Sequence, residues 1–68
     1  MITIVRIHHV RRAGMCARGA REFFLRHALS WEDFLQNGID AAILDRTGDA
    51  MAKQVAELAR KEQSSETR

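Results

Sequence analysis

Apolar residues recur at helical spacing along most of this 68-residue chain, and the clearest run lies between residues 16 and 29. Neighbouring members of the run are three or four positions apart, and most of the charged residues fall on the opposite side. This pattern predicts an amphipathic helix over residues 16–29. The side expected to face inward comprises Cys16, Ala20, Phe23, Phe24, His27 and Ala28.

The next segment, ALSWEDFLQNGI (residues 28–39), contains both a start and a stop signal for a short helix. Ser30 is a typical N-cap, and Asp33 takes the place where a capping box has Glu or Gln. Gly38 predicts the end of the helix through a left-handed C′ conformation, with Ile39 folding back as the apolar residue after it. The apolar face of this helix is expected to consist of Trp31, Phe34 and Leu35.

Three further short helices are predicted over residues 8–13, 41–46 and about 50–61. Asp40 is a plausible N-cap for the second of these, and Thr47 or Asp49 for the third. These helices predict one small shared core. Their expected inward residues are Ile7, Val10, Ile43, Leu44, Met51, Val55 and Leu58, with small contacts from Ala52, Ala56 and Ala59.

The two ends of the chain differ from this helical pattern. Residues 2–5 are mostly β-branched and predict an extended segment, but no second strand is evident. The segment is therefore expected to pair with a symmetry mate or to lie across the helices. Residues 63–68 contain no apolar side chain and are expected to be disordered. The predicted fold is all-α: one domain over residues 1–62 with about four short helices.

A domain of this size has a small core, which rarely supplies more than about 3–5 kcal/mol of net stability. The chain has one cysteine, Cys16, and therefore no internal disulfide. Self-association or docking onto a larger partner is the expected supplement. No signal peptide and no apolar stretch of membrane-spanning length is evident, so a soluble intracellular protein is expected.

Charge is unevenly distributed along the chain. Residues 1–27 carry six arginines and one glutamate, a net charge of +5, whereas residues 28–68 carry a net charge of −3. Arginine suits the recognition of carboxylates or phosphates better than lysine does. Alternatively, the two parts of the chain attract one another within a monomer or across a dimer.

Residues with chemical reactivity form no recognisable catalytic pattern. His8, His9, Cys16 and His27 match no zinc-ligand spacing, and neither a nucleophile–base pair nor a phosphate-binding loop is evident. Cys16 and His27 are predicted to be packed in the core. We therefore expect a protein that is not an enzyme and that binds no metal or cofactor.

The remaining arginines favour a binding function. An arginine-rich surface around an exposed apolar residue is typical of a protein-binding hot spot. We expect a partner protein with an acidic surface, and a homo-oligomer is a further possibility. The candidate partner-binding residues are Arg11, Arg12, Arg18, Arg21 and Leu25.

Nucleic-acid binding is the alternative function. Two helices around Gly38 resemble a helix-turn-helix, but bulky Phe34 then occupies a position that needs a small residue. The would-be recognition helix also brings Asp40 and Asp45, which phosphates repel. A small nucleic-acid-binding regulator would instead use the N-terminal arginines.

Residues 14–52 resemble a family of very small proteins encoded in prophages and tailed bacteriophages. The shared pattern is roughly GxCxxGxRxFFxRHxLxWxxFLxxGIxAxxLxxTGDAMA, and the chain departs from expectation at Ala28, where glycine is expected. The resemblance implies a phage origin and a location in the bacterial cytoplasm or the virion. It implies no catalytic residue and no particular function.

Overall fold

The computed structural model describes residues 2–66, with the side chains of residues 2–63. Five helices confirm the expected small, mostly α-helical fold, and the only strands in the described part are two short ones. The elements follow in the order β1 (Ile4–Val5), α1 (Ile7–Arg12), α2 (Ala17–Arg26), α3 (Trp31–Asn37), β2 (Ile39–Asp40), α4 (Ala41–Arg46) and α5 (Ala50–Glu66).

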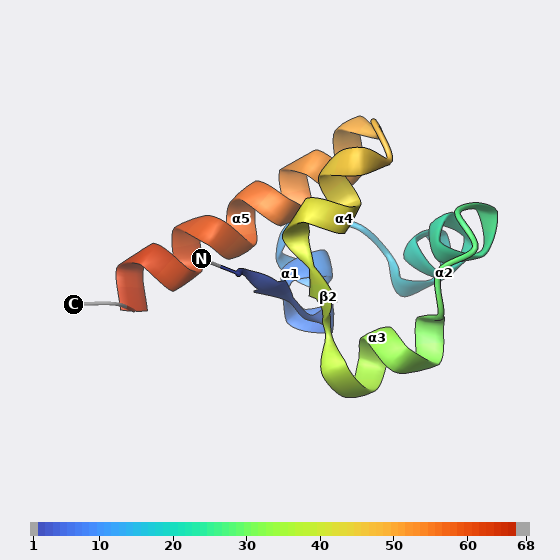
Figure 1. The fold of residues 1–68 in the computed structure, drawn as a ribbon, viewed down its shortest axis with the longest axis horizontal. Coiled ribbons are helices and arrows are strands. Elements are labelled where there is room, and N and C mark those ends of the chain that lie inside the picture. Colours follow the sequence, from blue (N-terminus) through green and yellow to red (C-terminus); the bar gives the residue numbers. More distant parts are fainter. Residues whose placement is uncertain (1, 67–68) are drawn as a thin grey trace.

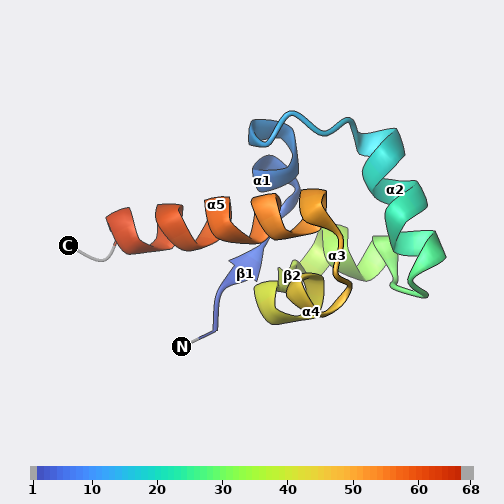
Figure 2. The same cartoon turned by 90° about the horizontal axis from the view of Figure 1, so that it is seen from above.

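Helix α5 runs along the longest dimension of the molecule (Figure 1). α1 and α4 pack against α5 from different sides, and α2 and α3 lie at the end away from the C-terminus (Figure 2). The second half of α5 extends beyond the other helices in both views. The N-terminal elements that contact α5 are α1 and β1.

The N-terminal segment finds its partner within the chain, so the expectation of a symmetry mate is wrong. β1 pairs antiparallel with β2, Ile4 opposite Asp40 and Val5 opposite Ile39. Ile39 therefore continues as a strand instead of folding back onto α3. Gly38 makes this possible with φ 78° and ψ −174°, an extended conformation with positive φ rather than the predicted left-handed helical one.

The start of α3 is as predicted from the sequence, with one difference. Ser30 Oγ accepts the backbone N–H of Asp33 at 3.1 Å, which confirms the N-cap. Asp33 does not complete the capping box, because its carboxylate accepts from the Asn37 side chain at 2.8 Å. Asp33 thus links the first turn of α3 to its last residue.

The two last helices are also capped by aspartates. Asp40 Oδ1 accepts the N–H of Ala42 at 3.0 Å, and Asp49 Oδ2 accepts that of Ala52 at 2.9 Å. The side of α5 that packs inward is nevertheless rotated from the predicted one. Met51 is exposed, and the buried residues of α5 are Ala52, Val55, Ala56 and Ala59. Small side chains on this side let α4 and α1 approach α5 closely.

An aromatic cluster joins α2 to α3. The ring centroid of Phe24 lies 4.8 Å from that of Phe34 and 5.3 Å from that of Trp31. Phe34 is 2% exposed, which confirms it as a core residue. Leu35 and Ile43, which were expected to face inward, are exposed instead, because each helix is short and turns only one narrow face to the core.

Helix α2 ends earlier than predicted, at Arg26. Leu29 N–H donates to Phe24 O at 2.8 Å and Ala28 N–H donates to Leu25 O at 3.2 Å. These two bonds define a Schellman motif, with Ala28 at the C′ position in the left-handed conformation (φ 57°). The one departure from the phage-protein pattern thus falls at a position where glycine is favoured.

The C-terminal helix is longer than expected. α5 continues through Glu66 and so extends into the segment that was expected to be a disordered tail. The rest of the expected tail, residues 67–68, lies outside the described residues. Within residues 2–66, no helix combines the length and the apolar character that a membrane crossing requires.

Candidate functional site

The outward side of α2 forms a shallow hollow with the start of α3. This hollow has a volume of about 430 Å³. The Schellman turn at Ala28 creates it, because the turn brings Leu29 and Trp31 back alongside the helix that they follow. The residues that line it are Arg18, Arg21, Glu22, Leu25, Leu29 and Trp31. We call this set the α2 surface.

Leu25 gives the α2 surface its apolar centre. Its side chain is 81% exposed, the highest value among the large apolar residues that the structure describes. Leu29 and Trp31 are half-buried and pack against the core on their inner sides. An exposed leucine beside two partly exposed apolar side chains is unusual on a small monomeric domain, where isolated apolar residues are the norm.

The arginines of the α2 surface have no counter-ion in the described part of the chain. Arg18 and Arg21 form neither an ion pair nor a hydrogen bond through their side chains with described residues. The same is true of Arg11. Among the described residues, Arg12 is the only arginine of residues 1–27 that pairs with an acidic residue of the later part of the chain. Mutual neutralisation of the two parts therefore involves one of these arginines.

The structure brings together three of the five predicted binding residues, Arg18, Arg21 and Leu25. Arg11 and Arg12 belong to α1 and do not line the hollow. Arg12 donates from Nη1 to Glu62 Oε2 of α5 at 2.7 Å. Helical spacing assigns Trp31 to the core and gives no sign that it also lines the hollow.

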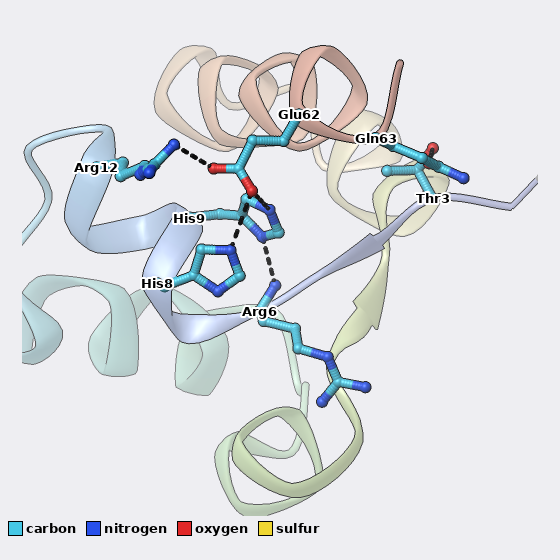
Figure 3. Close-up of polar contacts among 7 residues, drawn as sticks. All are labelled: Thr3, Arg6, His8, His9, Arg12, Glu62 and Gln63. Carbon is cyan, nitrogen blue, oxygen red and sulfur yellow. Dashed lines mark hydrogen bonds and ion pairs between the residues drawn. The ribbon is translucent and has the colours of Figure 1, made fainter. Parts of the chain in front are cut away.

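A second cluster joins α1 to α5 around Glu62 (Figure 3). Oε1 of Glu62 lies 3.2 Å from Nε2 of both His8 and His9, while Oε2 takes the bond from Arg12. An ionised carboxylate can only accept, so His8 donates from Nε2. A single acidic side chain thus faces three basic residues of one short helix. We call these four residues the Glu62 cluster.

His9 is held in one tautomer. It is 6% exposed, and its Nδ1 accepts the backbone N–H of Arg6 at 2.9 Å. Nδ1 must therefore carry the lone pair, which leaves the proton of the neutral ring on Nε2, facing Glu62. Burial lowers the pKa of His9, as do the charges on His8 and Arg12, and Glu62 opposes them only in part.

The pKa of Glu62 is shifted in the direction that keeps it ionised. The hydrogen bond from His8 lowers this pKa from its usual value, and the charge of Arg12 adds to the effect, while burial acts against both. The lowered pKa keeps the carboxylate ionised at neutral pH, where it is available as an acceptor.

The Glu62 cluster has the composition of a metal site but not its hydrogen bonding. One ligand atom each of His8, His9 and Glu62 lies within 4.8 Å of the others. Binding a metal through Nε2 of His9 would need the lone pair there and the proton on Nδ1, which would then face the N–H of Arg6. Two ligands remain, fewer than the three that catalytic zinc sites use. The sequence-based expectation of no metal site stays a prediction.

The positions of the other reactive residues correct the sequence analysis. Cys16 is exposed rather than buried, and its Sγ accepts the N–H of Gly19 at 3.3 Å as the N-cap of α2. His27 is also exposed and packs its ring against Phe23, with centroids 4.5 Å apart. Both lie near the ends of α2, where the inward face of the helix no longer meets the core.

The sequence carries a local signal for only one part of the Glu62 cluster. His9 stands at the third helical position after Arg6, the place from which a capping-box side chain reaches back to the N-cap N–H. The contribution of Glu62, 53 positions further along the chain, has no local signal.

No protein-family model, curated protein or solved structure matches this chain.

Proposed function

We propose that this protein is a non-catalytic interaction module whose α2 surface binds an acidic segment of a partner protein. The observation that carries the proposal is the exposed side chain of Leu25 beside Arg18 and Arg21, neither of which has a counter-ion in the described part of the chain. An apolar side chain of the partner would enter the hollow, and its carboxylates would pair with the two guanidinium groups.

The physical chemistry of interfaces supports this choice. Binding energy is concentrated in a few residues, among which Trp and Arg are enriched, and apolar neighbours exclude water from them. Trp31 is half-buried and lines the hollow, and Arg18 and Arg21 offer planar donors suited to carboxylates. Glu22 lines the same hollow, but neither guanidinium forms an ion pair with it.

The biological setting proposed for the module is that of a phage or prophage protein. This part rests on the resemblance of residues 14–52 to the phage-encoded family and on nothing else. A morphogenesis factor, a virion accessory protein or an adaptor to a host protein would each use such a module. The bacterial cytoplasm or the virion is the corresponding location, and self-association is compatible with the same surface.

The proposal is tested with a displayed library of short peptides of mixed composition. We expect the wild-type protein to enrich peptides with Asp or Glu around a Leu, Phe or Trp residue, with micromolar affinity typical of a short peptide. Leu25→Asp and the double variant Arg18→Glu, Arg21→Glu should both lose these peptides. The matched control is Leu35→Asp, which alters an exposed leucine of α3. Enrichment of peptides without acidic residues, or equal binding by all variants, contradicts the proposal.

Nucleic-acid binding by the same arginines is the alternative outcome. The exposed Leu25 favours a protein partner, since phosphate contacts need no apolar centre. Titration of duplex DNA at low and moderate salt separates the two, because phosphate-driven binding weakens steeply with salt. Salt-sensitive DNA binding that Leu25→Asp leaves unchanged would replace the present proposal.

A further inference from the structure

The Glu62 cluster is the main polar connection between α1 and the extended half of α5. His8 and His9 lie in the first turn of α1 and Arg12 at its end, and all three face Glu62 (Figure 3). The cluster borders a hollow of about 300 Å³ between β1, α1 and α5. On the other side of α1, Val10 is buried against the core. The strength of the cluster therefore bears on how firmly α1 is held.

His9 has no free position for a second proton. Nε2 already carries one and faces Glu62, so a second proton must go to Nδ1, which accepts the Arg6 N–H at 2.9 Å. Protonation would place the new N–H of His9 Nδ1 directly against the backbone N–H of Arg6. The Arg6 N–H, which precedes the first turn of α1, would also lose its acceptor in a part-buried setting.

The surrounding charges do not compensate for that loss. The charged or titratable groups that face His9 are His8 and Arg12 from α1 and Glu62 from α5, with the Arg6 side chain lining the adjoining hollow. Glu62 already serves Arg12 and His8. The rings of His8 and His9 lie 3.9 Å apart between centroids, so a charge on one opposes a charge on the other.

We propose that the Glu62 cluster is a pH-sensitive latch, in which neutral His9 holds α1 on α5 and mild acidification releases α1. The released helix accepts the second proton without penalty, because His9 then faces water and Arg6 N–H bonds to water. The latched form excludes that proton. Acid therefore favours release, and neutral pH restores the latch.

The sign of the effect follows from linkage. The pKa of His9 in the latched form lies below the ordinary histidine value of 6.5, so neutral His9 stabilises the latched form fully above about pH 6.5. This contribution is lost as the pH falls from 6.5 towards the lowered pKa. For one proton, the equilibrium for release changes by at most about tenfold per pH unit over that range.

Amide hydrogen exchange tests the latch, with α2 as an internal reference. Between about pH 7.5 and about pH 5.5, on either side of the histidine value, we expect the protection of α1 amides to fall several-fold relative to those of α2, after correction for intrinsic exchange. His9→Gln should remove this pH dependence, because Gln at the same position accepts the Arg6 N–H but does not titrate. His27→Gln, the control at an exposed histidine outside the cluster, should retain it.

Three results would overturn the proposal. Protection of α1 and α2 could fall in parallel, which indicates general acid destabilisation rather than a local release. The relative loss could persist in His9→Gln. If that variant fails to fold, the NMR titration of the His9 ring in the wild-type protein decides instead: a midpoint below 6.5 supports the latch, and a midpoint at or above 6.5 contradicts it.

Discussion

Gly38 lies directly against Val5 across the two-stranded sheet. A Cβ atom at position 38 would come within 2.8 Å of the Val5 carbonyl oxygen and would overlap the side chain of Ile4. The turn that ends α3 therefore has no room for a side chain. This close approach allows Ile39 to pair with Val5 and so connects the first residues of the chain to the middle of the sequence.

Gly38→Ala is expected to destabilise the protein strongly. The substitution combines a positive φ of 78° with the overlap on β1, and the two costs together amount to roughly 2–5 kcal/mol. Gly48→Ala is the matched control: its φ of 74° is similar, but nothing lies within 4 Å of the added Cβ. It should cost only about 1–2 kcal/mol. Urea denaturation of the two variants measures the difference, and equal midpoints would show that the contact with β1 is unimportant.

The local signals of the sequence predicted most of the helix starts and stops. Ser30 and Asp40 cap the helices that follow them, and Gly38 ends α3, as expected. The pairing of β1 with β2 had no such signal, because two-residue strands carry too little alternation to be recognised. The paired residues Ile4 and Asp40 are also 36 positions apart, and the approach at Gly38 brings the two strands together.

Ala28→Gly is expected to stabilise the protein. Ala28 has φ 57° at the C′ position of the Schellman motif that ends α2, where an L-residue with a Cβ is disfavoured by about 1–2 kcal/mol. Glycine removes this strain but adds entropy to the unfolded chain, which leaves a net gain of about 0.5–1 kcal/mol.

The end of α1 supplies the reciprocal variant. Gly14 occupies the same C′ position with φ 83°, since Gly14 N–H donates to Arg11 O and Met15 N–H to Val10 O. Gly14→Ala should therefore lower the melting temperature, while Ala28→Gly raises it. Thermal melts followed by circular dichroism check both. A lower melting temperature for Ala28→Gly would mean that the alanine methyl makes a contact worth more than the strain.

Phe34→Ala is expected to unfold most of the protein. Phe34 is 2% exposed and packs on Phe24 and Trp31, so truncation to alanine should cost about 3–5 kcal/mol. A domain of this size has about that much net stability. Its neighbour Leu35 is 48% exposed, and Leu35→Ala should cost less than about 1 kcal/mol. Near-equal melting curves for the two variants would contradict the orientation of α3.

The residues of the candidate sites also divide into those that spacing within one helix predicts and those whose role depends on a contact distant in sequence. Arg18, Arg21 and Leu25 lie within one helix, so helical spacing alone groups them on its polar side. The role of Arg12 depends on Glu62, 50 positions away, and no spacing rule connects the two. The burial of His9 depends on the same contact between α1 and α5. The sequence therefore predicted an arginine surface but not which arginines remain available.

The ion pair of Arg12 and Glu62 predicts a difference between two adjacent arginines. Arg12→Gln removes the 2.7 Å bond to Glu62, whereas Arg11 makes no such bond with the described residues. We expect Arg12→Gln to lower the urea midpoint and Arg11→Gln to leave it unchanged. If both variants unfold like the wild type, the exposed pair contributes nothing measurable, as is common for surface ion pairs.

Glu62→Gln is expected to change the response of the protein to strong acid. The folded pKa of Glu62 is lowered from 4.5, chiefly by the hydrogen bond from His8, so the folded state binds this proton less readily than the unfolded chain. The contribution to stability is therefore fully present above pH 4.5 and is lost as the pH falls through the lowered pKa. Glu62→Gln should be less stable than the wild type at neutral pH, and the difference should shrink in acid. Urea midpoints at neutral pH and below pH 4 measure it, with Glu57→Gln as the matched control on an exposed position of the same helix. A difference that stays constant across this range would show that the carboxylate charge of Glu62 does not stabilise the contact between α1 and α5.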